Sequence, residues 1–408
     1  MTQRVVVTGL GCISAAGFNT DNFANKLFLP EHQTAQTISP LSAFTNEAAR
    51  AHFAAIVPDY DPQTHFSKSQ LKQLDRFAQF ALLATDEALA HAQLTTDNIV
   101  PQRTAVIHGT SIGGQETIEN SYLQLLQEGK ARAHPFTVPK LLPSSATSQI
   151  SMKYGITGPS FSTSSACSSS AHAIAMAVLM LRSGLVDTAI AGGAEACITE
   201  GNFRVWEGLR VLSTDTCRPF SASRTGLIIG EGAGTLILET LEHALARSAP
   251  IHAELVGIGM SSDAHNIVQP LAEGAQQAMQ AALDDANCSP DKIQYINAHG
   301  SGTVQNDSTE TQAIKNVFQS HARNLAISST KSLHGHVLGA GGAIESIASI
   351  MAITHQTVPP TRNYLAADPT CDLNYVPNHP VKKDIQYAMS NSFAFGGLNA
   401  ALLFKKFS

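Results

Sequence analysis

The chain has 408 residues, of which 43% are hydrophobic and 14% are charged, and its formal net charge is −6. This length and hydrophobic fraction exclude a disordered chain and suffice for one large core or two cores of about 200 residues each. The negative charge argues against general nucleic-acid binding, although a local basic patch could still hold an acidic partner.

Strand-like segments alternate with helix-like ones in the first part of the chain. In chain order these are "RVVVTGL" at 4–10, a helix at 71–93, "TAVIHG" at 104–109, helices at 116–127 and 171–181, "DTAIAGG" at 187–193 and "GTLILET" at 234–240. Such alternation predicts βα units and mostly parallel sheets, with functional loops at the strand ends.

The same order returns after residue 250. It runs through "HAELVGIGM" at 252–260, a helix at 275–286, "IQYINAHG" at 293–300, "LAISST" at 325–330, a helix at 343–354, "QYAMSNS" at 386–392 and "ALLFKK" at 401–406. The repetition predicts a duplicated layout with one half at 1–250 and the other at 251–408. Because no low-complexity linker separates the halves, we expect them to share an interface, which is a common place for a site.

No segment looks like a membrane span or a secretory leader. The longest apolar run, 171–181, is broken only by His172 and followed by Arg182, so its length fits a core helix. The N-terminal "RVVVTGLG" is typical of a strand that enters a turn. Six cysteines without paired spacing predict reduced thiols rather than a disulfide framework or a zinc ribbon. We therefore expect a soluble cytoplasmic protein.

Cys167 stands in the segment "STSSACSSSAHAIAMAVLML" at 162–181, directly before the predicted core helix. The N-terminus of a helix stabilises a thiolate, and serines are good capping residues there, so the position predicts a reactive thiol with a lowered pKa. A buried cysteine that packs as a small hydrophobic side chain remains the alternative. Other residues must decide between the two.

Three segments of the second half carry candidate partners. "NAHGSGT" at 297–303 places His299 in a glycine-rich loop, and "SSTKSLHGHVLGAGGAIES" at 328–346 offers Lys331, His334 and His336. "SNSFAFGGLN" at 390–399 is a Gly-Gly turn that carries two phenylalanines. Taken singly, each histidine could be an ordinary loop residue and each glycine pair an ordinary turn.

Together, from "VVVTGLGCISAAG" to "NSFAFGGLNA", these elements resemble the elongating, decarboxylating β-ketoacyl-acyl-carrier-protein synthases of type I and II. The resemblance implies the α/β thiolase fold, with two βαβαβ halves in five αβαβα layers. It implies that Cys167 of "ACSSS" is the nucleophile and that His299, Lys331 and His336 complete the catalytic set. His334 falls at a variable position, so we expect it to be non-catalytic.

The resemblance also implies a mechanism. Cys167 accepts an acyl group, malonyl-carrier protein then loses CO2, and the resulting carbanion attacks the acyl-enzyme. Neutral His299 and His336 would donate from Nε2–H to the developing oxyanion, and the backbone N–H groups of Cys167 and Phe395 would form the oxyanion hole.

Further roles follow from the same resemblance. Lys331 would act through its charge and pair with Glu345, while Ser301 and Thr303 would hydrogen-bond the phosphopantetheine arm of the acyl carrier protein. Ser301 replaces the threonine usual at its position. The chain itself would bind no cofactor and no metal. We expect a homodimer, with a heterodimer of related synthase subunits as the alternative.

A basic docking patch would suit the acidic carrier protein. Lys68, Lys72 and Arg76 recur every four residues and would share one helix face, although any solvated helix shows such charges. Further docking candidates are Lys130, Arg132 and Arg210.

The gate and acyl pocket are matched to Phe393, Phe395, Ser111, Ile112 and Thr137. Thr137 stands where the family often has phenylalanine, which suggests a roomier tunnel for a long, polyunsaturated or aryl-capped chain. In the gating loop, Ala394 replaces a usual glycine and Leu398 a common threonine, so loop mobility or acyl preference would differ.

Four alternatives stay open at this point. "GTSIG" at 109–113 matches the nucleophile elbow of α/β-hydrolases, with Ser111 as the nucleophile. A thiolase would use a second, late cysteine, and Cys371 in "DPTCDLNYVP" is the candidate. A chain-length-factor subunit would be an inactive relative, which typically lacks the cysteine. A zinc site is disfavoured because the spacing gives no chelating pair on a helix.

Overall fold

The computed structural model describes residues 3–34, 36–41 and 52–408. Its centre is a ten-stranded sheet with the order β11-β10-β14-β15-β9-β1-β8-β6-β4-β5. The strands of its first half are β1 (Val5–Ser14), β4 (Thr104–Gly109), β5 (Ser160–Thr163), β6 (Thr188–Glu195) and β8 (Gly232–Thr240). Those of its second half are β9 (Ala253–Ser262), β10 (Tyr295–Asn297), β11 (Ala326–Ser328), β14 (Tyr387–Ala394) and β15 (Leu398–Lys405).

Both halves of the sheet have the same topology. If the five strands of each half are numbered in chain order, both halves read third, second, fourth, fifth, first from the sheet edge to the centre. This order is β5-β4-β6-β8-β1 in the first half and β11-β10-β14-β15-β9 in the second. In both, the second strand pairs in parallel with the third and fourth, and the fifth pairs antiparallel with the fourth and first. The prediction of mostly parallel sheets was therefore wrong: half of the ladders in each half are antiparallel. In the second half a three-residue turn, Phe395–Gly397, joins β14 to β15, and so short a turn permits only antiparallel pairing.

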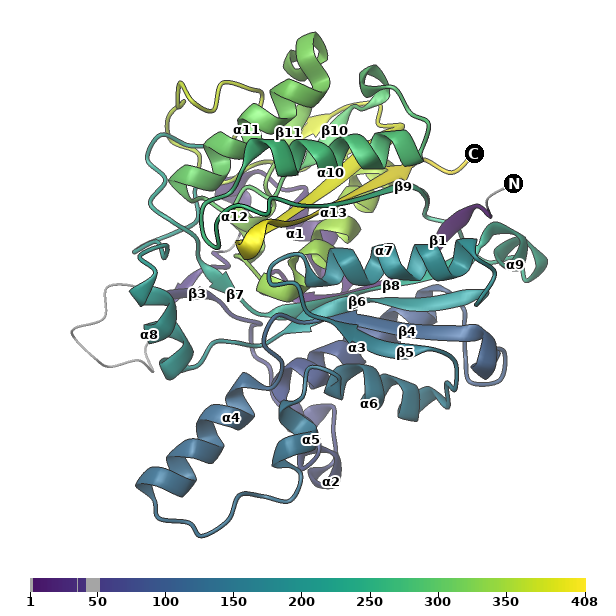
Figure 1. Ribbon diagram of the computed structural model, residues 1–408, viewed down its shortest axis with the longest axis vertical. Coiled ribbons are helices and arrows are strands. Elements are labelled where there is room, and N and C mark those ends of the chain that lie inside the picture. Colours follow the sequence, from purple (N-terminus) through teal and green to yellow (C-terminus); the bar gives the residue numbers. More distant parts are fainter. Residues whose placement is uncertain (1–2, 35, 42–51) are drawn as a thin grey trace.

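The predicted five layers are confirmed (Figure 1). The two halves of the sheet meet through a short β1–β9 pairing, Val6↔Glu254 and Val7↔Ala253. Helices α7 (Ser169–Arg182) and α13 (Gly341–His355) lie between them. The outer layers are α3 (Arg76–His91) with α6 (Ser145–Tyr154), and α10 (Ala272–Asp285) with α11 (Val304–Phe318).

The central helices are buried on nearly all sides, which explains their small and apolar residues. Every residue of α13 from Gly341 to Ile353 is buried. The helices approach closely at Gly342, where a Cβ would come within 2.9 Å of the Cβ of Ala171. This layer contacts strands of both halves. We propose the division at residue 250 as the domain boundary; it falls between α9 (Leu241–Ala246) and β9.

The predicted helix at 71–93 is interrupted. The structure has α2 (Lys68–Leu71), capped by Lys72, and a separate α3 whose N-cap is Asp75. The Asp75 carboxylate accepts from the N–H of Phe77 at 3.3 Å and from the N–H of Thr117 at 2.9 Å. Because this buried cap starts a new helix, Lys68, Lys72 and Arg76 do not share one helix face, and that part of the docking prediction was wrong.

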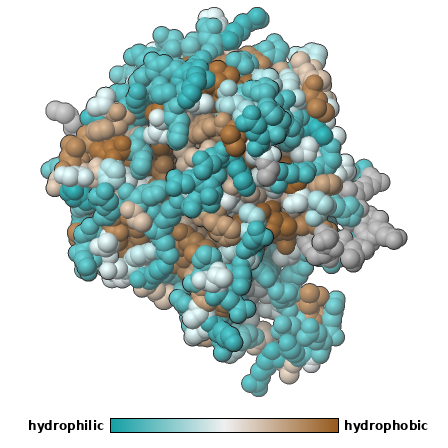
Figure 2. Space-filling model, turned by 180° about the vertical axis from the view of Figure 1, so that it is seen from behind, coloured by the Kyte–Doolittle hydropathy of each residue, from teal (hydrophilic) through white to brown (hydrophobic). Residues whose placement is uncertain are grey.

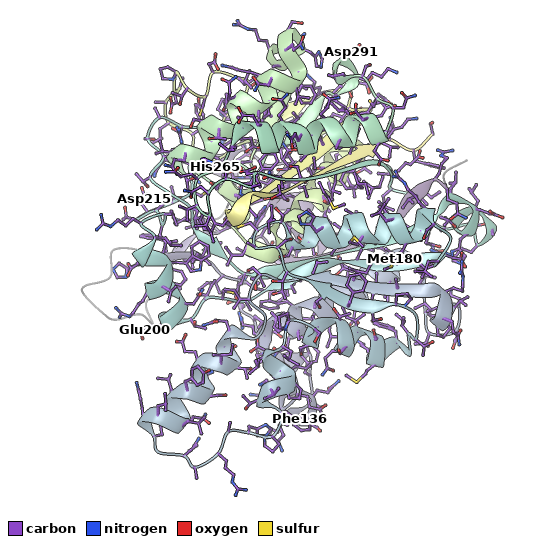
Figure 3. All side chains as sticks on the ribbon, in the orientation of Figure 1. Phe136, Met180, Glu200, Asp215, His265 and Asp291 are labelled. Carbon is purple, nitrogen blue, oxygen red and sulfur yellow. The ribbon has the colours of Figure 1, made fainter. Side chains whose placement is uncertain are left out.

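An arm, defined as residues 115–141, projects from the first half (Figures 1 and 2). It contains α4 (Gln115–Tyr122), a π-helical turn Leu123–Gln127 and α5 (Thr137–Leu141). In Figure 3 Phe136 lies on this arm, well apart from Glu200 at the start of α8 (Glu200–Gly208). The remaining elements are α1 (Thr20–Leu27), α12 (Lys331–His334), β2 (Ser39–Pro40), β3 (Phe53–Ala55), β7 (Ile229–Gly230), β12 (Thr357–Val358) and β13 (Val381–Lys382).

Within the described ranges, the structure contains no helix of the length and apolarity that a membrane crossing requires. All six cysteines are free thiols, as predicted.

Candidate active site

Cys167 lies in the turn between β5 and α7. The preceding residue, Ala166, has a φ of +50°, an uncommon conformation for a residue with a Cβ. Two serine hydroxyls hold this turn. Ser169 Oγ accepts from the N–H of Ser165 at 2.9 Å and donates to the carbonyl of Ala166 at 2.6 Å. Ser168 Oγ contacts the carbonyl of Leu398 at 2.7 Å, which ties the turn to the second half.

The prediction of a lowered pKa for Cys167 was wrong. Burial raises the pKa of this thiol to about 12, although the charge of Lys331 and the N–H of Phe395 act in the opposite direction. The side chain is only 8% exposed, and α7 begins two residues further on, so desolvation exceeds the effect of the helix terminus. Cys167 is therefore a neutral thiol in the resting protein.

His299 lies in the loop that follows β10. Glu310 on α11 fixes this loop, because its carboxylate accepts from the N–H of His299 at 2.9 Å and from the N–H of Gly300 at 2.8 Å. The Nδ1 atom of His299 faces the ammonium of Lys331 at 3.4 Å. Since an ammonium can only donate, Nδ1 is the acceptor and the ring proton sits on Nε2.

His336 follows α12 and has the same tautomer. Its Nδ1 accepts from the N–H of Leu338 at 3.1 Å, which leaves the proton on Nε2. The two imidazole rings meet edge to face, with their centroids 5.3 Å apart. Burial, and then the charge of Lys331, hold the pKa of both histidines well below its usual value. Both are therefore neutral donors through Nε2–H.

Lys331 is fully buried and connects these groups. Its ammonium donates to the carbonyl of His299 at 2.6 Å and to the carboxylate of Glu345. Burial raises the pKa of Glu345 to about 7, and Lys331 opposes that rise. His334 points elsewhere: its Nε2 bonds the hydroxyl of Thr330 at 3.0 Å.

Phe395 begins the turn between β14 and β15, and its backbone N–H faces the sulfur of Cys167. Gly396 and Gly397 follow with φ values of +80° and +68°, which glycine adopts without strain. Ala394 has an extended φ of −110°, so alanine is accommodated there without backbone strain. The expected difference in loop mobility therefore has no source in the conformation of Ala394.

A cavity of about 410 Å³ joins these groups. Its walls include eight of the predicted residues: Cys167, His299, Ser301, Thr303, His336, Phe393, Phe395 and Arg210. The hydroxyls of Ser301 and Thr303 lie 2.9 Å apart at its wall. Ser111, Ile112 and Thr137, predicted for the acyl pocket, do not line this cavity; Thr137 is the first residue of α5 on the arm.

The other docking candidates lie away from the cavity lining. Arg76 is bound to Glu231 at 2.6 Å and lies over the rings of Tyr60 and Phe80, so it has a packing role. Lys130 pairs with Glu128 at 3.5 Å, and Arg132 is exposed beside it on the arm.

Two of the alternatives fit these positions poorly. The Ser111 hydroxyl donates to the carboxylate of Glu195, and within the described residues no imidazole bonds to it, so the base of a hydrolase is missing. Cys371 is 2% exposed, packs in the core of the second half and does not line the cavity.

Sequence reasoning missed several residues of the site. Glu310 and Glu195 are buried carboxylates that hold the loops after β10 and β4. Trp206, the only tryptophan of the chain, lines the cavity. For Glu310 the sequence did carry a signal, because Asp307 lies three residues before it and so on the same helix face. Glu195 and Trp206 could not be found in this way, because their roles depend on long-range contacts.

The comparisons with known proteins agree with this geometry. The family model "Beta-ketoacyl synthase, N-terminal domain" matches residues 2–244, and "Beta-ketoacyl synthase, C-terminal domain" matches residues 252–365. Nodulation protein E of Rhizobium leguminosarum bv. trifolii is 44% identical over 409 residues, covering 100% of both chains. The 3-oxoacyl-[acyl-carrier-protein] synthase 2 of Staphylococcus aureus (strain N315) is 42% identical over 413 residues, covering 99% of each.

Among solved structures, the ishigamide ketosynthase/chain length factor superposes with a TM-score of 0.94 at 33% identity, covering 100% of both chains.

Proposed function

This chain belongs to the β-ketoacyl synthase family, and we propose that it joins an acyl group held on Cys167 to a malonyl group held on a carrier protein. One observation carries the proposal. A buried thiol, a backbone N–H aimed at its sulfur and two imidazoles locked as Nε2–H donors share one cavity.

In the first half-reaction the Cys167 sulfur attacks the thioester of an acyl-carrier protein. The bond from the carbonyl carbon to the pantetheine sulfur breaks, and the Cys167 proton passes to that leaving sulfur. The exchange replaces one thiol by another, so the step releases no net proton and Cys167 need not be a thiolate in the resting protein. The N–H groups of Phe395 and Cys167 hold the tetrahedral oxyanion.

In the second half-reaction malonyl-carrier protein loses CO2, and the electron pair of the broken C–C bond forms an enolate. The Nε2–H groups of His299 and His336 stabilise the negative oxygen. The enolate carbon attacks the acyl carbonyl, the bond from that carbon to the Cys167 sulfur breaks, and the sulfur leaves as a thiolate that takes a proton from water. Lys331 pairs with Glu345, and burial, together with the charge of Lys331, holds the pKa of both imidazoles well below its usual value.

The carrier protein is a proposed partner. The Staphylococcus relative is named for an acyl-carrier-protein substrate, and the cavity walls offer Ser301 and Thr303 to a pantetheine arm. Arg210 lines the cavity beside Leu209 and Ile267, which are 45% and 76% exposed. We place carrier docking at this rim, with Lys68, Lys72, Lys130 and Arg132 as outlying contributors. The chain supplies no cofactor in this scheme; the carrier brings its phosphopantetheine.

The arm supports a proposed second subunit. It exposes Tyr122, Leu126 and Val138 at 61%, 80% and 62%, and β5 is an edge of the sheet. Thr137 on this arm would then reach an acyl pocket across the interface. The partner is a second copy or, as in the solved ketosynthase/chain length factor, a related subunit. Sedimentation of Leu126→Glu with Val138→Glu tests this; a molar mass equal to the parent's would contradict it.

The reaction itself is tested by incubating the protein with a panel of acyl-carriers and measuring intact mass and CO2. We expect an acyl adduct on Cys167 and CO2 release only with malonyl-carrier. An adduct on Ser111, or turnover of acetoacetyl-CoA without CO2, would contradict the proposal, and no adduct at all would indicate a chain-length-factor role. We also propose a cytoplasmic location, which free buried thiols favour.

A further inference from the structure

Trp206 lies on α8, within the long connection 196–231 between β6 and β8. Its indole is stacked on the ring of Phe395, with centroids 6.0 Å apart and an interplanar angle of 26°. Both rings are half-buried and both line the cavity. An element of the first half therefore holds the side chain of the residue whose N–H faces the nucleophile.

The other polar contacts of the Phe395 turn are made by its backbone. The N–H of Gly396 donates to the carbonyl of Ile267 at 2.8 Å, and the N–H of Asp263 donates to the carbonyl of Gly397 at 2.9 Å. The two glycines have left-handed φ values and can change conformation at low cost. The side chain of Asn399 also donates to the carbonyl of Gly397 at 3.2 Å, and the N–H of Phe395 faces Cys167. None of these contacts involves the Phe395 ring, which is the part of the turn that the stack on Trp206 holds.

The order of the two half-reactions requires the Phe395 turn to change conformation. Both substrates approach Cys167 through the same cavity, whose volume is about 410 Å³. An acyl chain attached to the sulfur must leave that space before the malonyl arm occupies it. Phe395 stands beside the sulfur, and Trp206 stands against Phe395. A short acyl group fits beside an unmoved ring, whereas a long one displaces the Phe395 ring from the indole.

We propose that Trp206 is a positioning and specificity-determining residue: its stack on Phe395 is a latch that holds the Phe395 N–H on Cys167 and parts when a long acyl chain is loaded. The inference rests on the proposed function, because it needs Cys167 to be acylated. It predicts that chain length, and not acylation alone, decides whether the stack opens.

Because Trp206 is the only tryptophan, its fluorescence reports the stack directly. The protein is mixed with acetyl- or octanoyl-loaded carrier that lacks tryptophan, and intact mass is measured in the same sample. We expect octanoylation to change the emission spectrum and acetylation to leave it near that of the free protein. Cys167→Ala with octanoyl-carrier is the control and should show no change.

An octanoyl adduct with unchanged emission would overturn the latch while leaving the proposed function intact. Equal changes with both acyl groups would overturn its dependence on length. Absence of any adduct would overturn the proposed function and the latch together.

A second measurement separates the latch from simple packing of α8. In Trp206→Leu the ratio of kcat/KM for octanoyl transfer to that for acetyl transfer should rise about 3- to 10-fold, the scale of one aromatic pair. Trp206→Phe keeps a ring on Phe395 and should keep the parent's ratio. The ratio is insensitive to the fraction of folded protein. Parental ratios in both variants, or equal shifts in both, would overturn the proposal.

Discussion

In each half of the molecule the third strand leads into a turn at the cavity and then into a central helix. In the first half β5 leads to Cys167 and α7; in the second half β11 leads to Lys331, His336 and α13. The turns occupy equivalent places in the same topology. One offers a thiol, and the other offers an ammonium and an imidazole N–H donor.

The second strands repeat this contrast. The loop after β4 presents Ser111, whose N–H and hydroxyl are bound by Glu195. The loop after β10 presents His299, whose N–H is bound by Glu310. A buried carboxylate holds each loop, but only the second loop carries a side chain that can act on a carbonyl oxygen. The two halves thus share a scaffold but carry different side chains at equivalent places.

The largest effect should come from the nucleophile. Cys167→Ala is expected to lower condensation on the order of 10⁴-fold, because in the proposed mechanism no other group forms the acyl-enzyme. Formation of the β-ketoacyl-carrier product, with acyl-carrier and malonyl-carrier both present, is the measurement. Cys288→Ala, outside the cavity lining, is the matched control and should keep parental activity. If Cys167→Ala retained a tenth of the rate, the first half of the molecule would not supply the nucleophile.

The second-largest effect should come from the two imidazole donors of the second half. His299→Ala and His336→Ala should each lower CO2 release by about 10²- to 10³-fold, because each removes one Nε2–H from the enolate oxygen. The acyl-enzyme should still form, as intact mass will show. His355→Ala, exposed at the end of α13, serves as the control. Loss of acyl-enzyme in either variant would contradict the proposal that the first half carries out acylation and the second half carries out decarboxylation.

The carboxylate that holds the His299 loop gives a pH test of stability. Burial raises the pKa of Glu310 from 4.5 to about 7. The stabilisation linked to this raised pKa is complete below pH 4.5 and is lost as the pH rises through 7. The loss is about 3 kcal/mol in the free energy of unfolding. The free energy of unfolding is measured with urea at pH 4.5 and at pH 8. Its decrease between these pH values should be smaller in Glu310→Gln than in the parent, by about that amount. An equal decrease in both proteins would contradict it.

The smallest effect concerns the connection 196–231, which is long in the first half and only three residues long in the second. Arg210→Glu should raise the KM for acyl-carrier about 5-fold without changing the KM for a short pantetheine mimic, because a rim charge acts on the approaching carrier. Lys68→Glu with Lys72→Glu should act in the same direction and more weakly. Equal effects on carrier and mimic would rule out docking at the cavity rim.

The sequence by itself determined the alternation of strands and helices, the duplicated layers and the candidate residues of the cavity. The alternation follows from local patterns. The five layers and the catalytic residues were implied by the family resemblance that short motifs such as "ACSSS" and "NAHGSGT" carry. Even the tautomer expected of the two histidines agrees with their hydrogen bonds to Lys331 and Leu338.

Only the tertiary structure decided the state of the thiol, the break at Asp75 and the contact of Trp206 with Phe395. Each depends on groups far apart in the chain. The thiol of Cys167 is buried and faces the N–H of Phe395 from the other half. The carboxylate of Asp75 accepts from the N–H of Thr117, and the aromatic stack joins residues from opposite halves. A local pattern shows which groups are present, but burial and long-range packing set their protonation and their partners.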